Sequence, residues 1–458
     1  MIARRLTIAD RIVLSFVFVI LAGTLILHLP ISSSEDEKIH LRACLFTATS
    51  AVCVTGLTVK DIGKDFSLFG QITIMLLVQI GGLGILTFSN WLVISLKGRK
   101  SDMGTRLLLS ESHGSLPNVE PVRLLRQIIL YTFLCEGVGA LLLFFRFIQD
   151  SPPAAAFWQA IFHSVAAFCN AGFSLFSDNL IGYRNDTTVN LTICGLIIMG
   201  GLGFVVFSDL TSYFTPSRSE TRRKRISYHT RVVLWTTFWL LVLFMGVFLV
   251  LEWNATMTGF SLKERLLASL FLSVTPRTAG FNTVDMGQLT NTTLIFQIFL
   301  MGVGASPGST GGGIKTTTFA VLVALVYSRF KNLPRIELLG RSLPVSVVTK
   351  SVAVGAAYGA VTFLATMIMQ FLETPTLASV YSHEARGMFL NHLFEVVSAL
   401  GTVGLSTGIT AKLTGASQLL LVLVMLIGRL GPLLLAESLV GGRKPRAYTL
   451  PEDYVLVG

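Results

Sequence analysis

A fourfold internal repeat is the feature that most limits what this chain of 458 residues can fold into. Four short turns align without gaps, and each has a glycine in one column, then Leu or Phe, then a small polar residue. The glycines are Gly56, Gly172, Gly280 and Gly404. Each turn ends an amphipathic segment of about 13 residues, which is too short to cross a bilayer and suits a re-entrant helix.

Long apolar segments flank every turn. Hydrophobic residues make up 52% of the chain and charged residues 13%, against roughly 25% charged in soluble domains, and the mean hydropathy is +0.69. Runs such as 12–29 and 232–251 are long enough to cross a hydrocarbon core of about 30 Å. The sequence predicts an all-α membrane protein whose repeats each contain a span, a re-entrant pore helix, a filter loop and a second span. Eight outer spans would surround one central pore, as in potassium channels.

The basic residues set the predicted topology. The net charge is +11, but the Lys and Arg residues gather in alternate loops and at both ends, so a nucleic-acid partner is not indicated. By the positive-inside rule these segments and both termini are cytoplasmic. The run 222–225 either contacts anionic lipid headgroups or is a solvated loop. The predicted units are repeats at 1–100, 101–217, 218–332 and 333–447, with a cytoplasmic tail at 448–458.

The turns predict a cation filter. Irregular backbone at membrane depth must be buried in protein or line a wet cavity, and converging carbonyls replace the hydration shell of an ion. The pore-helix C-termini add partial negative charge. Because no Asp or Glu lies in the turns, a monovalent ion is favoured over calcium. The candidate filter residues are Val54, Thr55, Gly56, Asn170, Ala171, Gly172, Thr278, Ala279, Gly280, Thr402, Val403 and Gly404.

The third repeat departs from the pattern. Its second span breaks into a loop at 304–316, too rich in glycine for a regular helix, and we expect this interruption in the third repeat alone. The loop is a candidate gate below the filter, with Arg429 of the fourth repeat facing the same cavity as an electrostatic barrier held by loop carbonyls. The candidate gate residues are Gly304, Ala305, Ser306, Gly308, Ser309, Thr310, Gly311, Gly312, Gly313, Lys315 and Arg429.

Several of these features also fit a purely structural role. The loop could be a plain structural break, and a phosphate loop is disfavoured because no strand precedes it. The motif Gly-Gly-Leu-Gly at 81–84 and 200–203 indicates close helix packing. The carboxylates Glu136, Glu395 and Glu437 are assigned to structural pairing rather than to proton relay. Ser306, Ser309 and Thr310 lack a visible base, so no enzyme activity is predicted, and no organic cofactor is expected.

The motifs at 275–282, 312–315, 428–432 and 451–458 give the sequence a resemblance to the Trk/Ktr/HKT superfamily of potassium transporters. It is most similar to the Ktr-type membrane subunits, the KtrB type. The resemblance implies potassium uptake across the cell inner membrane, a homodimer with one pore in each protomer, and a cytosolic ring of KtrA-like, nucleotide-binding RCK subunits. It also implies that four filter glycines select potassium, so that the predicted metal is potassium only, and that sodium (Na+) dependence is common. Obligatory potassium–sodium symport and a sodium-permeable or non-selective cation channel stay open as alternatives.

Overall fold

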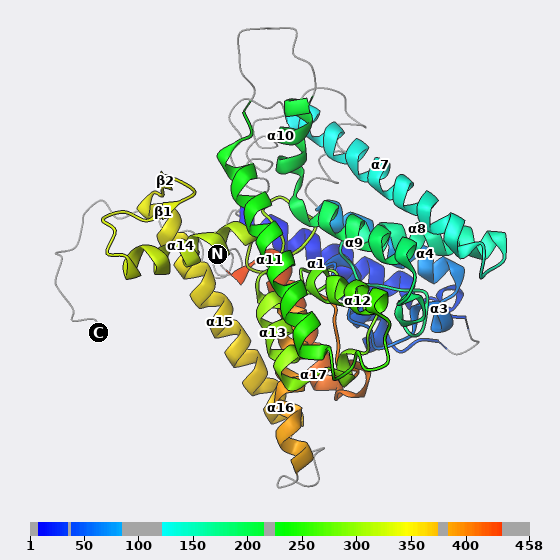
Figure 1. Ribbon diagram of the computed structural model, residues 1–458. Helices are drawn as coiled ribbons and strands as arrows, with labels where there is room; N and C mark the ends of the chain where they lie inside the picture. The colour runs from blue at the N-terminus through cyan, green and yellow to red at the C-terminus, as the bar shows by residue number, and fades with distance from the viewer. Residues whose placement is uncertain (1–7, 35–37, 85–120, 215–224, 374–382, 433–458) are drawn as a thin grey trace, which may run out of the picture.

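The computed structural model describes residues 8–34, 38–84, 121–214, 225–373 and 383–432. The regular secondary structure within them is helical apart from a two-stranded hairpin, in which β1 (Glu337–Leu338) pairs antiparallel with β2 (Arg341–Ser342). The helices fall into four consecutive groups with the same order of parts (Figure 1). Each group has a long helix, a short helix that ends at a filter turn, and a third helix that returns.

The bounds of the helices follow the predicted repeats. The first group is α1 (Ile8–Leu27), η1 (Pro30–Ser32), α2 (Leu41–Val52), α3 (Ile62–Asp65) and α4 (Leu68–Leu83). The second is α7 (Pro121–Phe147), α8 (Pro153–Phe168), η2 (Ile181–Tyr183), α9 (Thr187–Leu202) and α10 (Phe204–Phe214). The third is α11 (Tyr228–Glu252), α12 (Leu262–Val274), η3 (Met286–Gln288), α13 (Asn291–Gly302) and α14 (Thr316–Phe330). The fourth is α15 (Val345–Glu373), α16 (His383–Gly401), η5 (Thr410–Lys412) and α17 (Gly415–Leu430).

Four helices are long and apolar enough to cross a membrane: α1, α7, α11 and α15. Together, α9 and α10 pass the same test as a broken pair bent by 96°. The other returning helices are apolar but shorter than a span within the described residues. The eight-span arrangement therefore stays a prediction.

The groups pack in a closed ring. In each case the returning helix of one group packs against the pore helix of the next: α4 on α8, α9 on α12, α13 on α16 and α17 on α2. The last of these contacts joins the fourth group back to the first. A closed ring of four pore helices and four returning helices follows from this packing.

The repeating apolar columns of the sequence form the core behind the turns. Phe46, Phe162 and Phe394, each ten residues before its glycine, are buried. In the third repeat, Phe271 is buried beside the aligned Leu270, which is only half-buried. The Leu or Phe that follows each glycine is also buried. These side chains belong to the buried apolar core of the helices around the turns.

The expectation that only the third repeat is interrupted was wrong. Helix α9 ends at Gly203, after which α10 continues at a steep angle. Gly203 has a φ of 91°, and the aligned Gly84 and Gly431 have φ values of 83° and 85° where α4 and α17 end. This backbone conformation is strained for L residues and accessible to glycine. The last glycine of the motif therefore stops the helix in three repeats, and only the third replaces the stop with a long loop.

The predicted packing role of the same motif is also present. A Cβ atom on Gly81 would lie 2.2 Å from the carbonyl oxygen of Val52, and one on Gly200 would lie 1.9 Å from that of Phe168. The fourth repeat has the same contact, 2.1 Å from a Cβ on Gly428 to the carbonyl oxygen of Leu400. In these three repeats, the first glycine of the motif thus lets the returning helix touch the C-terminal end of its own pore helix.

Candidate functional site

The four filter turns share one backbone conformation. All four glycines have positive φ: Gly56 96°, Gly172 66°, Gly280 77° and Gly404 93°. Two residues earlier, each turn has a non-glycine residue in the left-handed region: Val54 56°, Asn170 60°, Thr278 68° and Thr402 51°. Such conformations cost free energy for these residue types. Their recurrence at one register in four repeats indicates a backbone shape imposed by a common role.

The glycines themselves form a closed ring. A Cβ atom on Gly56 would lie 2.2 Å from the carbonyl oxygen of Ala171, and one on Gly404 would lie 2.1 Å from that of Thr55. A Cβ atom on Gly172 would lie 2.9 Å from the carbonyl oxygen of Ala279, and one on Gly280 would lie 2.5 Å from that of Val403. The carbonyl of the residue before each glycine therefore faces the glycine of an adjacent repeat. Every candidate filter residue lies in this ring or one residue from it.

Pore-helix side chains hold the turns in place. Ser50 Oγ accepts a hydrogen bond from Gly56 N at 3.0 Å, and Ser398 Oγ accepts one from Gly404 N at 3.1 Å. The third repeat uses Thr275 instead, whose hydroxyl donates to the carbonyl of Phe281. The sequence interpretation missed these supports, although the serines share a column six residues before the glycine.

A second set of supports lies nine residues before the glycine in repeats 2 and 4. His163 Nε2 lies 3.0 Å from Ser174 Oγ. Glu395 accepts hydrogen bonds from Ser406 Oγ (2.6 Å), Thr407 N (3.1 Å) and Thr410 Oγ1 (2.7 Å). Neutral donors thus satisfy this buried carboxylate, which fits a structural role.

Glu136 on α7 is a second predicted intramembrane carboxylate. It accepts a hydrogen bond from Gln79 Nε2 at 3.3 Å and lies 3.8 Å from the Cys169 thiol. It therefore also has partners, and they belong to the first repeat and to the second filter turn. Glu437 lies outside the described residues.

A polar cavity of about 570 Å³ opens above the ring. All four filter glycines line it, as do Asp61, Asp65 and Asp178. Carboxylates at the mouth raise the local concentration of cations without coordinating them in the turns. The described residues hold no cluster of His, Cys, Asp and Glu suited to a tightly bound metal ion. The arrangement suits an ion that passes through a ring of carbonyls.

The 304–316 loop lies against the other end of the ring. A Cβ atom on Gly311 would lie 2.1 Å from Thr278 Oγ1, and one on Gly312 would lie 2.3 Å from Thr402 Oγ1. Thr278 and Thr402 are the left-handed residues of the third and fourth turns. The loop glycines are therefore needed because the loop touches the filter with no space for side chains.

The loop is anchored to the second repeat. Three backbone hydrogen bonds hold it there: Ser306 N to Gly201 O (3.0 Å), Thr310 N to Gly200 O (3.3 Å) and Phe204 N to Gly308 O (2.9 Å). Gly200 and Gly201 belong to the Gly-Gly-Leu-Gly motif, and Phe204 follows its stop glycine. The break in the second repeat thus exposes backbone groups that bind the loop of the third.

Internal hydrogen bonds close the loop on itself. Gly304 N donates to Ile314 O at 2.8 Å, and Thr316 N donates to Ala305 O at 3.2 Å. The hydroxyls of Ser306 and Thr316 lie 3.0 Å apart, and Ser309 Oγ donates to Ser306 O at 2.6 Å. The two ends of the loop are therefore paired, and they run parallel to each other. Gly308 and Gly313 each have a φ of 68°, a conformation that favours glycine.

Two cations bind loop carbonyls. Lys315 Nζ donates to Gly311 O at 2.7 Å. The Arg429 guanidinium donates to the carbonyls of Thr310 and Gly81. Neither forms an ion pair with a carboxylate within the described ranges. Arg429 therefore contacts the loop and links three repeats: its own, that of the loop and that of α4.

Comparisons with known proteins agree on one family. Residues 8–438 match the family TrkH, described as a cation transport protein. The chain is 35% identical over 460 residues to the potassium/sodium uptake protein NtpJ of Enterococcus hirae, covering all of this chain and 98% of that protein. It is 36% identical to the Ktr system potassium uptake protein B of Vibrio alginolyticus, covering 98% of this chain and 94% of the relative. Protein B of the Bacillus subtilis Ktr system is also 36% identical, over 94% and 92%.

A solved structure has the same fold. The crystal structure of the potassium transporter TrkH from Vibrio parahaemolyticus superposes with a TM-score of 0.70 at 20% identity. The match covers 95% of this chain and 85% of the solved one.

Proposed function

Because the chain belongs to the TrkH family of cation transport proteins, we propose that it takes up potassium through the filter formed by its four turns. The ring of carbonyls and positive-φ glycines carries this proposal, since backbone oxygens around an axis replace the hydration shell of a dehydrated cation. The names of the relatives from Vibrio alginolyticus and Bacillus subtilis, potassium uptake protein B of a Ktr system, support the same ion. The chain is a transporter subunit rather than an enzyme.

The pore would span the inner membrane with eight outer helices and with both termini in the cytoplasm. The Ktr system named in the relatives implies a partner, and we propose a cytosolic KtrA-like ring of nucleotide-binding RCK subunits. We also propose a homodimer with one pore in each protomer. The roles of the individual filter and loop residues belong to the same proposal.

The loop would act as the gate. It touches the filter at Thr278 and Thr402, so an ion leaving the filter meets it directly. Conduction then requires the loop to leave its hydrogen bonds with the second repeat and with Arg429. A hydrogen bond to a charged donor contributes about 1.5–3 kcal/mol, so loss of the Arg429 bond to the Thr310 carbonyl would shift the closed-to-open ratio by about 10- to 100-fold.

Growth tests the function, and flux tests the gate. In a bacterial strain without potassium uptake of its own, the chain should restore growth at low potassium. Arg429→Ala should raise the flux of the reconstituted protein. Arg429→Lys keeps the charge but cannot bind two carbonyls as a fork, so it should resemble Arg429→Ala if Arg429 acts as a tether, and wild type if it acts as a charge barrier. Unchanged flux in both variants would refute the gate.

One observation supports a second candidate, coupled uptake of potassium and sodium. The relative from Enterococcus hirae is named for both ions. Potassium flux with and without sodium on the same side separates coupled uptake from a simple pore, because a symporter needs both ions and a pore needs only one.

A further inference from the structure

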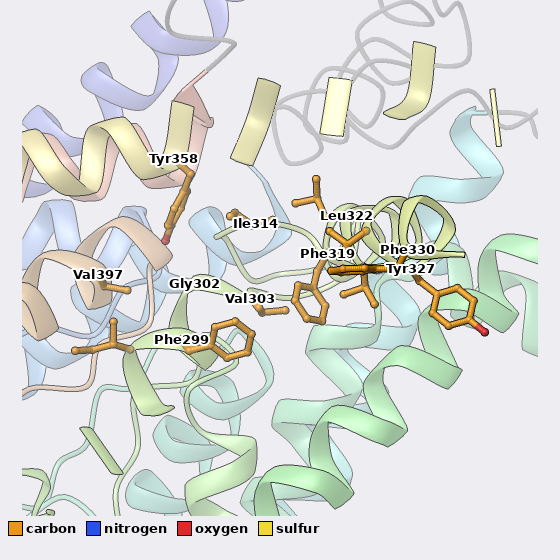
Figure 2. Close-up of a pocket in the computed structure, with 13 residues that line it drawn as sticks. Phe299, Gly302, Val303, Ile314, Phe319, Leu322, Tyr327, Phe330, Tyr358 and Val397 are labelled. Carbon is orange, nitrogen blue, oxygen red and sulfur yellow. The ribbon is translucent and has the colours of Figure 1, made fainter. Parts of the chain in front are cut away.

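An apolar pocket of about 680 Å³ lies beside the two ends of the loop (Figure 2). Gly302, Val303 and Ile314 line it, and these residues begin and end the loop. Val303 and Ile314 pair with each other as a backbone bridge. Tyr358 of α15 and Val397 of α16 lie on one side, and α14 forms the other. A molecule bound in the pocket would therefore contact the residues at both ends of the loop.

The pocket faces the surroundings of the protein along α14. Val323, Val326 and Tyr327 line it and are each about half exposed, and Phe330 is 84% exposed. In a membrane protein, apolar side chains exposed in this way contact acyl chains. The far end is closed by Tyr358, whose buried hydroxyl has no hydrogen-bond partner within the described residues. The pocket is thus open to lipid at one end and blind at the other.

Cations gather where α14 ends. Arg329, Lys331 and Arg335 are exposed there. Lys331 Nζ lies 5.0 Å from the ring centroid of Tyr327, which is itself a pocket residue. Basic residues just cytoplasmic of a membrane helix favour anionic lipid headgroups. The site therefore combines an apolar channel with a positively charged entrance.

The length of α14, from the loop to the basic residues at its end, matches the thickness of one bilayer leaflet. The 15 residues of α14 have a length of about 22 Å at 1.5 Å per residue. Half of a bilayer, including its headgroup region, measures about 21 Å. A lipid with its phosphate beside Lys331 would therefore reach the level of Ile314 with the end of its chain.

We propose that an anionic phospholipid of the inner leaflet binds here, with its phosphate at Arg329 and Lys331 and one acyl chain in the pocket against Ile314. The proposal rests on the proposed topology, in which the end of α14 is cytoplasmic. The bound chain occupies the space into which Val303 and Ile314 would swing, so it restrains the loop.

Photolabelling tests the site directly. The full-length protein is reconstituted in phosphatidylcholine vesicles that contain phosphatidylglycerol with a diazirine at the end of one chain. After illumination, the label should map to residues 302–322. Phosphatidylcholine carrying the same diazirine should label this segment much less. Substitution of Arg329→Gln together with Lys331→Gln should weaken competition by unlabelled phosphatidylglycerol about thirtyfold, from two surface charges.

A second experiment fills the pocket with a bulky side chain. Val326→Trp should abolish the label at 302–322, whereas Val250→Trp, at a 76% exposed position on α11, should leave it unchanged. Equal labelling by the two lipids, or labelling that survives Val326→Trp, would overturn the proposal. Cross-linking of the pocket to a second copy of the chain in lipid-free detergent would overturn it as well. Because labelling needs no ion flux, a failure of this site is distinguishable from a failure of the transport proposal.

Discussion

The two ends of the pore differ in symmetry although the same repeat builds both. At the filter, four turns have matching φ values and each glycine touches the next repeat. Beneath it, three repeats end their returning helices at a glycine, and the third inserts the 304–316 loop. Coordination of an ion requires oxygens on every side of it, whereas one segment is enough to block a path. Symmetry is therefore retained at the filter and lost below it.

The largest expected effect comes from a methyl group in the filter ring. In Gly404→Ala the new Cβ would meet the carbonyl of Thr55, and a left-handed alanine is strained by about 1–3 kcal/mol. We expect potassium flux to fall on the order of 100-fold. The matched control is Gly408→Ala, which has a similar φ of 88° but nothing within 4 Å of its Cβ. If both variants lost flux equally, backbone strain rather than the ring contact would be responsible.

A methyl group in the loop should act in the opposite direction. A Cβ on Gly304 would lie 2.1 Å from the carbonyl of Gly312, so Gly304→Ala forces the loop ends apart. With about 1 kcal/mol from each of two lost hydrogen bonds, we expect basal flux to rise about thirtyfold. Gly302→Ala, two residues earlier with open space around its Cβ, is the control and should conduct as wild type does. Reduced flux in Gly304→Ala would show that the loop supports the open pore instead.

The features of this site that recur in every repeat were easier to predict from the sequence than those that occur once. The glycine column predicted four turns of one shape because only backbone in a rare conformation needs glycine at one register in every repeat, and all four glycines have positive φ. The contact of Arg429 with the loop was expected because a buried arginine needs acceptors. The helix stop at Gly203 was not expected, since a glycine motif in a membrane helix serves packing and termination equally well. The pocket beside the loop joins α13 to α16, so no local pattern could predict it.

Removal of the serine supports should have a smaller effect. Ser50→Ala and Ser398→Ala each remove one hydrogen bond to a filter amide, worth about 1 kcal/mol. We expect selectivity for potassium over sodium to fall about fivefold in either variant. The second repeat has Ala166 in this column, so Ala166→Ser should leave selectivity unchanged or raise it. A larger loss in Ala166→Ser than in the other two variants would contradict a supporting role for the column.

The smallest effect is expected outside the pore. Glu264 caps α12 and forms an ion pair with Arg184 of the second repeat at 3.5 Å. Hydrogen bonds from the backbone and hydroxyl of Ser261 hold the pKa of Glu264 below its usual value. Its contribution is therefore present at neutral pH and is lost as the pH falls through that lowered pKa. Glu264→Gln should lower thermal stability by less than about 1 kcal/mol and leave flux unchanged, and any change in selectivity would be unexpected.

Ion selectivity of the purified chain in vesicles is the most direct measurement of the central claim. Uptake of potassium is compared with uptake of rubidium, sodium and lithium under identical gradients, with Gly404→Ala as the disrupted filter. A fourfold carbonyl ring predicts that potassium and rubidium enter, that sodium and lithium are strongly disfavoured, and that Gly404→Ala loses this preference. Equal entry of all four ions in the wild type, or no entry of any of them, would contradict a potassium filter built from the four turns.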